Sequence, residues 1–178
     1  MKRLVLLRHA KSAWDNPALA DHDRPLNPRG RAAALAMARA VSELAPDLVL
    51  CSDAARTRET ASLLVEAGAI DEARIIYDAG LYLAEPEMIL ARLNALAGDA
   101  ATVMIVGHNP GLQALATHLI RSGDPAGRAT LAEKFPTAGL AVIDFDSAAW
   151  PGTADPVSVA EAGRLSRFVT PRALAMAG

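Results

Sequence analysis

Three short aliphatic runs constrain the fold of this chain more than any other feature of its sequence. Residues 4–7, 48–51 and 103–106 read Leu-Val-Leu-Leu, Leu-Val-Leu-Cys and Val-Met-Ile-Val, with no polar residue in alternate positions. Runs of this kind are typical of strands buried on both faces, as in a parallel sheet covered by helices. The sequence therefore predicts an α/β fold with a mostly parallel central sheet flanked by helices.

Segments of helix length separate these runs. Asn27 can cap a helix whose first turn accepts Pro28, and Pro86 and Pro110 mark two later starts in the same way. The expected helices cover residues 27–44, 54–66, 85–96 and 109–121. A further strand is expected at residues 140–146, beside an edge of the sheet, and another at either 157–159 or 165–169.

Composition limits the size, the core and the partners of the protein. A chain of 178 residues suits a single domain spanning residues 1–178. Apolar residues make up 52% of the chain and aromatic residues 4%, so the core must be aliphatic. The net charge of −2 gives no general attraction to nucleic acid or to anionic membranes. Neither is an expected partner, and any recognition of phosphate must be local.

The cysteine content and the apolar segments indicate a cytoplasmic protein. Cys51 is the only cysteine, so a disulfide within the chain is impossible and a reducing compartment is expected. The apolar run near the start ends at Arg8, too early for the ~7–15 apolar residues of a secretion signal. No run approaches the ~18 apolar residues of a membrane helix.

Polar residues follow each of the three aliphatic runs directly. The first is followed by Arg8 and His9, the second by a segment ending in Arg56, and the third by Gly107 and His108. The carboxyl ends of parallel strands share one edge of a sheet, where ligands of open α/β folds bind. Helices that begin nearby would direct their amino ends to the same place. Two arginines and two histidines are thus expected to form a site for a small dianion.

These segments resemble the motifs of the histidine phosphatase superfamily. Residues 7–12 (Leu-Arg-His-Ala-Lys-Ser) are similar to its Arg-His-Gly signature, and residues 52–61 (Ser-Asp-Ala-Ala-Arg-Thr-Arg-Glu-Thr-Ala) to its second motif. Residues 24–30 resemble the segment before its first helix, and residues 106–110 its second-histidine motif. The resemblance spans residues 3–145 and is greatest to the short SixA-type phosphohistidine phosphatases. It implies a phosphoglycerate mutase-like fold, and the short stretch 57–107 leaves no room for a large cap insertion.

The resemblance implies a role for each of the four residues. His9 would be the nucleophile, Arg8 and Arg56 would bind the phosphate, and His108 would donate to the same oxygens. Their chemistry agrees, because a neutral imidazole with a pKa of ~6.5 can attack phosphorus and guanidinium groups match phosphoryl oxygens. A covalent phospho-His9 intermediate would then be hydrolysed by water.

Two departures from the family pattern bear on the mechanism. Ala10 replaces the usual glycine, which is a small change only if its φ is negative. The acid that protonates the leaving group is not evident: Glu85 is the first candidate and Glu87 the second. An acid is dispensable if the substrate is phosphohistidine whose other ring nitrogen already carries a proton, because the leaving group is then a neutral, weakly basic imidazole. Phosphohistidine on a protein is therefore the expected substrate, with a small phosphorylated metabolite as the alternative.

Other interpretations remain open at this point. Cys51 precedes Arg56, as in cysteine-dependent phosphatases, but with four intervening residues rather than five. A phosphoglycerate mutase activity and a non-catalytic phosphate-binding module are further alternatives. No metal or cofactor is expected, because metal-ligand spacings of His and Cys are absent. Lys11 either contacts substrate or begins a solvated loop, and Arg24 is expected to anchor that loop. The oligomeric state is not indicated.

Overall fold

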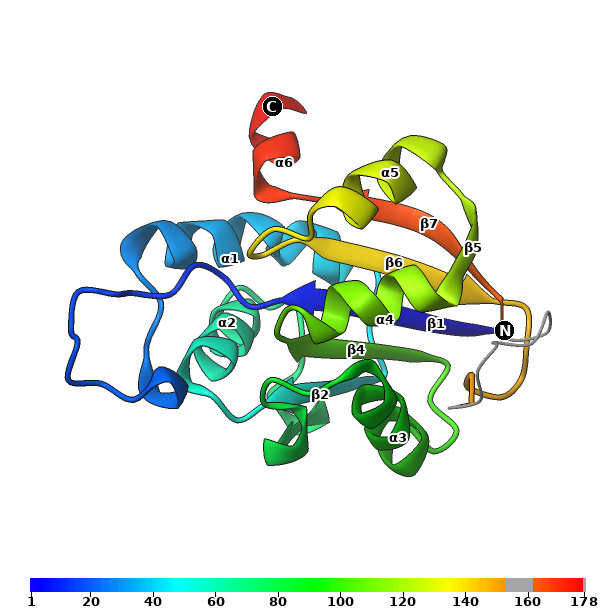
Figure 1. The fold of residues 1–178 in the computed structure, drawn as a ribbon, viewed down its shortest axis with the longest axis horizontal. Coiled ribbons are helices and arrows are strands. Elements are labelled where there is room, and N and C mark those ends of the chain that lie inside the picture. Colours follow the sequence, from blue (N-terminus) through cyan, green and yellow to red (C-terminus); the bar gives the residue numbers. More distant parts are fainter. Residues whose placement is uncertain (153–161, 178) are drawn as a thin grey trace.

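The computed structural model describes residues 1–152 and 162–177, whose strands form one seven-stranded sheet in the order β3-β2-β4-β1-β6-β7-β5 (Figure 1). The strands are β1 (Lys2–Arg8), β2 (Leu48–Ser52), β3 (Ile75–Asp78), β4 (Thr102–Gly107), β5 (Ile120–Gly123), β6 (Leu140–Phe145) and β7 (Gly163–Val169). The α-helices are α1 (Pro28–Ser42), α2 (Ala55–Glu66), α3 (Pro86–Leu96), α4 (Gly111–Leu119), α5 (Pro125–Glu133) and α6 (Pro171–Ala177). The predicted α/β fold is confirmed.

The three aliphatic runs lie side by side in the middle of the sheet. β4 pairs in parallel with β1 on one side and with β2 on the other. Their central residues, such as Val5, Leu50 and Ile105, have no exposed surface. Because these strands are covered on both faces, every side chain along them can be apolar, which explains the missing polar alternation.

The strand predicted at residues 140–146 is present, but its predicted position beside an edge of the sheet is wrong. β6 lies between β1 and β7 and runs antiparallel to both, so it is an interior strand and not one beside an edge. Of the two positions considered for the last strand, residues 165–169 fall within β7, and residues 157–159 lie outside the described residues. The edges of the sheet are β3 and β5.

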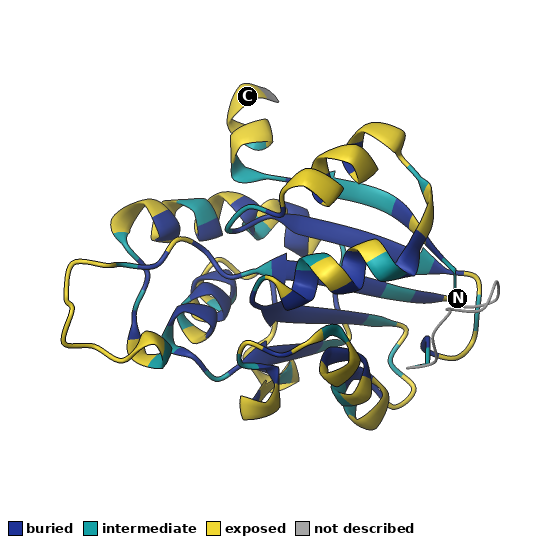
Figure 2. Ribbon diagram, viewed as in Figure 1, coloured by how far each residue is buried: buried dark blue, intermediate teal, exposed yellow. Residues whose placement is uncertain are grey.

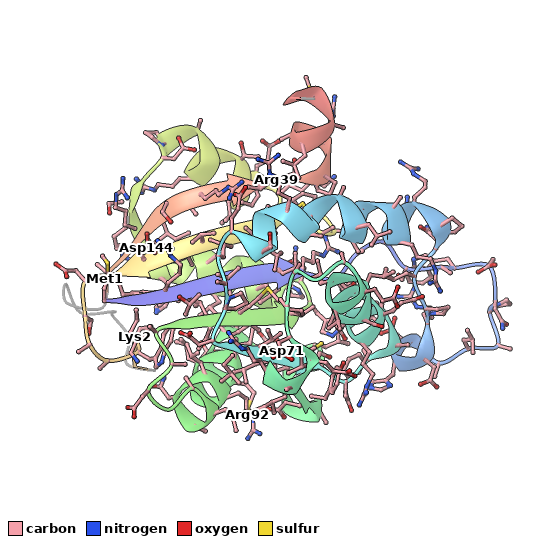
Figure 3. The ribbon with its side chains drawn as sticks, turned by 180° about the vertical axis from the view of Figure 1, so that it is seen from behind. Met1, Lys2, Arg39, Asp71, Arg92 and Asp144 are labelled. Atoms are coloured by element: carbon pink, nitrogen blue, oxygen red, sulfur yellow. The ribbon has the colours of Figure 1, made fainter. Side chains whose placement is uncertain are left out.

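Helices cover both faces of the sheet and create two hydrophobic cores. On one face α3, α4 and α5 pack against residues such as Leu6 and Ile105, and on the other α1 and α2 pack against Val5 and Met104. Figure 2 shows the buried sheet between helices whose outer faces are exposed, and Figure 3 shows α1 and α2 from behind. None of the helices within residues 1–152 and 162–177 is long and apolar enough to cross a membrane.

The start of α1 fixes the loop that follows β1. The Asn27 side chain accepts a hydrogen bond from the Gly30 backbone N–H at 2.8 Å, as its predicted capping role requires. A Cβ atom on Gly30 would lie 2.1 Å from the Lys11 carbonyl oxygen, so only glycine permits this close approach of the loop. The loop of residues 10–27 projects beyond the end of the sheet opposite to the N-terminus (Figure 1).

Candidate active site

A cavity of about 580 Å³ opens at the carboxyl ends of β1, β2 and β4. Its lining includes Arg8, His9, Arg56 and His108, the four residues that the sequence predicts to form one site. His9, Arg56 and His108 are almost fully buried, at 7%, 3% and 2% exposure. The structure therefore brings the four side chains together, while their catalytic roles stay predictions.

The His9 ring is held in a defined protonation state. Its backbone N–H donates to the Gly107 carbonyl at 3.0 Å, which continues the pairing of β1 with β4. Its Nδ1 lies 2.7 Å from the Ala10 carbonyl oxygen. Because a carbonyl only accepts, Nδ1 must carry the proton, which leaves a lone pair on Nε2. Burial, opposed by the bond to Ala10 and aided by nearby arginines, lowers the pKa of His9 to about 4, so the ring is neutral at pH 7.

The alanine that follows His9 is compatible with its backbone conformation. The described non-glycine residues with positive φ are Ala45, Leu83 and Ala138, so Ala10 does not need the left-handed region that favours glycine. The Ala10 N–H donates to the Thr60 hydroxyl at 3.0 Å, and that hydroxyl donates to the Arg56 carbonyl within α2. Thr60 thus joins the loop after His9 to the helix that carries Arg56.

His108 contacts Ser52, a residue whose part in the site the sequence analysis missed. The His108 Nε2 lies 2.7 Å from the Ser52 hydroxyl oxygen, which in turn accepts from the Ala54 N–H at 3.4 Å. A serine that donates to Nε2 leaves the proton of the neutral ring on Nδ1, a buried nitrogen with no partner in the described structure. Burial, with His9 and Arg56 nearby, lowers the pKa of His108 to about 3. The centroids of the His9 and His108 rings lie 5.3 Å apart, and the ring planes are tilted by 52°.

The two arginines reach the cavity from different elements. Arg8 donates from Nη1 to the Phe135 carbonyl at 2.8 Å. Arg56 donates from Nη1 to the Asp21 carbonyl at 2.7 Å and from Nη2 to the Asp21 carboxylate at 3.1 Å. The Nε atoms of both are buried without a partner among the described residues. Burial and the charge of Arg56 lower the pKa of Arg8. Unpaired buried donors are costly, and an anion with several acceptor oxygens would satisfy them.

Lys11 and Arg24 occupy different positions in the cavity wall. Lys11 is exposed at the cavity mouth. Arg24 is buried and donates within its own loop to the Ser12 hydroxyl, the Ala13 carbonyl and the Asp21 carboxylate. Its guanidinium carbon also lies 3.4 Å from the centroid of the Trp14 ring. These contacts agree with the predicted anchoring role of Arg24.

The two glutamates proposed as acids do not line the cavity. Glu85 occupies the N-cap position of α3, makes no side-chain capping bond and is exposed, and Glu87 is exposed in the first turn. Among the described residues that line the cavity, the carboxylate is that of Asp21. Hydrogen bonds from Tyr82, Arg24 and Arg56 lower the pKa of Asp21, which therefore holds no proton to donate at neutral pH.

Among the residues that the structure describes, neither a thiol nor a metal-binding cluster accompanies these four side chains. Cys51 is fully buried in the core beneath α1 and α2, and burial raises the pKa of its thiol, whereas a thiol nucleophile needs a lowered one. Within the described ranges, no three or more His, Cys, Asp or Glu side chains are grouped to hold a metal ion. The expectation of metal-independent chemistry stays a prediction.

Known proteins share both the sequence and the fold. Residues 4–82 match the model of the histidine phosphatase superfamily (branch 1). An uncharacterized protein of Mycobacterium tuberculosis is 43% identical over 141 residues, which cover 77% of this chain and 85% of that relative. A candidate phosphohistidine phosphatase SixA from Agrobacterium tumefaciens is 37% identical, with a TM-score of 0.74 and coverage of 96% of this chain and 99% of the other.

Two further structures extend the comparison. A candidate phosphohistidine phosphatase SixA from Nakamurella multipartitia is 33% identical, with a TM-score of 0.73 and coverage of 96% of both chains. A protein histidine phosphatase SixA solved with tungstate has a TM-score of 0.73 at 20% identity and covers 97% of this chain and 99% of the other, so it supports the fold alone. With the family match and these relatives, the chain belongs to branch 1 of the histidine phosphatase superfamily.

Proposed function

We propose that this protein is a phosphatase that transfers a phosphoryl group to Nε2 of His9 and then to water. The observation that carries the proposal is the buried His9 ring, whose Nδ1–H is bound by the Ala10 carbonyl at 2.7 Å, beside two arginines and a second neutral histidine. A free Nε2 lone pair among fixed cationic and N–H donors suits attack on a phosphoryl group.

The steps follow from the donors around His9. The Nε2 lone pair forms a bond to phosphorus as the bond to the leaving group breaks, and that group departs with its electron pair. Arg8, Arg56 and the Nδ1–H of His108 bind the three equatorial oxygens, over which charge spreads in the transition state. The Ala10 carbonyl supports the positive charge that the phosphorylated ring gains. Water then attacks phosphorus, the P–N bond breaks, and the lone pair returns to Nε2.

The lining of the cavity favours a substrate with a weakly basic leaving group. Its carboxylate, Asp21, is already bound by two arginines and a tyrosine, and Glu85 is exposed outside the cavity. A sugar or serine alkoxide needs a proton donor, whereas phosphohistidine whose other ring nitrogen is already protonated releases a neutral imidazole without one. We infer that the substrate is phosphohistidine on a protein, which agrees with the activity in the names of the SixA relatives. The single buried cysteine supports a cytoplasmic location.

A competition panel tests the substrate. A phosphohistidine protein, a phosphoserine peptide and small sugar phosphates are assayed at pH 7 in excess chelator, and kcat/KM is compared. We expect the phosphohistidine protein to have the highest value by ~10²-fold or more, since general-acid help of that size is missing for the alkyl esters. Higher values for a small ester would favour the alternative of a small-molecule phosphomonoesterase. Loss of all activity in chelator would overturn the metal-independent mechanism.

The role of Glu85 has its own test, with the rates of a series of aryl and alkyl phosphates plotted against leaving-group pKa. If Glu85 moves into the cavity and donates a proton, Glu85→Gln should slow poor leaving groups by ~10²–10⁴ and steepen the negative slope. From its exposed position we expect parallel lines for wild type and Glu85→Gln instead. Glu87→Gln tests the second candidate acid, which is exposed in the first turn of the same helix, and should also give a line parallel to wild type. A steeper slope for Glu85→Gln alone would restore it as the acid.

A further inference from the structure

Asp21 lies outside the motifs of the sequence but binds two arginines of the cavity. It lies in a short 3-10 turn (Asp21–Asp23) of the loop after β1 and lines the cavity. Its carbonyl oxygen accepts from Arg56 Nη1 at 2.7 Å, and its Oδ2 accepts from Arg56 Nη2 at 3.1 Å. Its Oδ1 accepts from Nε and Nη2 of Arg24 at 3.1 and 2.7 Å. One residue therefore binds both terminal nitrogens of Arg56 and two nitrogens of Arg24.

Tyr82 completes this arrangement from another part of the chain. Its hydroxyl donates to Asp21 Oδ2 at 2.6 Å, and the edge contact of its ring with the His108 ring has a centroid separation of 5.4 Å. The Arg56 guanidinium carbon lies 5.8 Å from the centroid of the same ring. The hydrogen bond to Asp21 raises the pKa of Tyr82, so the hydroxyl keeps its proton at neutral pH. Three separate segments thus meet at the Asp21 carboxylate.

We propose that Asp21 is a positioning residue, which fixes the orientation of the Arg56 guanidinium toward the transferred phosphoryl group, and that Tyr82 holds Asp21 in place. This inference rests on the proposed phosphatase function. Arginine has a long side chain with many rotamers, and a guanidinium stabilises the transition state only if it is oriented before the reaction. Asp21 binds Nη1 and Nη2 of Arg56, so Nε is the guanidinium nitrogen that has no partner in the described structure.

Whether removal of the Asp21 carboxylate raises or lowers turnover shows whether Asp21 positions Arg56 or obstructs the substrate. The Asp21 carboxylate is an anion beside phosphate ligands, so an obstructing role would require it to compete with substrate, and its removal would raise activity. A positioning role predicts the opposite for turnover. Substrate binding should change little, because Asp21→Asn removes a negative charge from a site that attracts a dianion, which offsets the poorer orientation of Arg56.

The test measures kcat and KM separately for Asp21→Asn on the best substrate of the panel. We expect kcat to fall by ~10–100-fold, the size of effect that a misplaced catalytic group produces, with KM changed less than about threefold. Asp23→Asn is the matched control, because Asp23 lies in the same turn and, among the described residues, its side chain is hydrogen-bonded to His22 alone. Its kcat should equal that of wild type.

A double-mutant cycle makes the route through Arg56 explicit. In an Arg56→Ala background, Asp21→Asn should lower kcat by less than about twofold, since there is no guanidinium left to orient. Tyr82→Phe keeps the ring beside His108 and removes only the hydroxyl, and we expect it to lower kcat several-fold in the same direction. This second variant carries the test if Asp21→Asn does not fold.

The outcomes that overturn the inference are distinct from failure of the proposed function. A rise in kcat for Asp21→Asn, an unchanged kcat, or equal losses with and without Arg56 would each exclude positioning of Arg56 by Asp21. A wild-type protein that hydrolyses no phosphorylated substrate would instead exclude the proposed function. Melting temperatures of all variants, measured in parallel, identify losses that come from unfolding.

Discussion

His9→Ala is expected to abolish turnover and the covalent phosphoenzyme together. The variant lacks Nε2 of His9, the only protein atom that the proposed mechanism bonds to phosphorus. The hydrogen-bond donors that remain in the cavity cannot act as a nucleophile in its place. The measurement is a single-turnover reaction with labelled substrate, quenched in base because a P–N bond is hydrolysed in acid. Wild type should carry label on His9, and His9→Ala should carry none.

His118→Ala supplies the matched control for this experiment. His118 lies in α4 and is not among the residues that line the cavity, so its replacement removes an imidazole without touching the site. It should retain wild-type turnover and labelling. Near-normal rates for His9→Ala would contradict the central assignment. Label that remains on His9→Ala would indicate a different nucleophile.

The middle of the sheet and the four main site residues could be predicted from the sequence because both depend on local patterns. Strands buried on two faces must be apolar throughout, so β1, β2 and β4 are visible as uninterrupted runs. Since parallel strands end at one edge, the residues after them had to meet there. These two rules place His9 and His108 at the same edge of the sheet, and the observed pairing of β1 with β4 brings them side by side.

The strands at the edges lacked such a signal. β3 has four residues, of which Ile76 and Tyr77 are 38% and 36% exposed, and it is too short to give a clear pattern. The helix predicted at residues 109–121 includes the first two residues of β5, whereas the helix in the structure covers Gly111–Leu119. Helix α5 is not among the predicted helices, although its start has a capping residue. The Asp124 side chain accepts hydrogen bonds from two backbone N–H groups of the first turn.

Asp21, Tyr82 and Ser52 could not be identified because their contacts join distant parts of the chain. Asp21 meets Arg56 across 35 residues and Tyr82 across 61, through a loop whose path no periodicity describes. The Ser52 hydroxyl is hydrogen-bonded to His108, which lies 56 residues later in the sequence. Sequence patterns predict which face of an element is buried, but they do not predict which polar groups meet across two loops.

Arg56→Ala is expected to lower kcat by ~10²–10³, the loss that follows removal of one preorganised donor from a transition state. The described side-chain hydrogen bonds of Arg56 go to Asp21, an exposed residue that keeps its bonds to Arg24 and Tyr82, so the melting temperature should change by only a few degrees. Arg58→Ala is the matched control on the same helix, because Arg58 is exposed and stacks on Tyr77 away from the cavity. Arg56→Lys should give an intermediate rate, since lysine keeps the charge but cannot present the planar fork. A loss below about tenfold for Arg56→Ala would mean that Arg56 does not bind the transferred group, since even one good charged hydrogen bond is worth more than that.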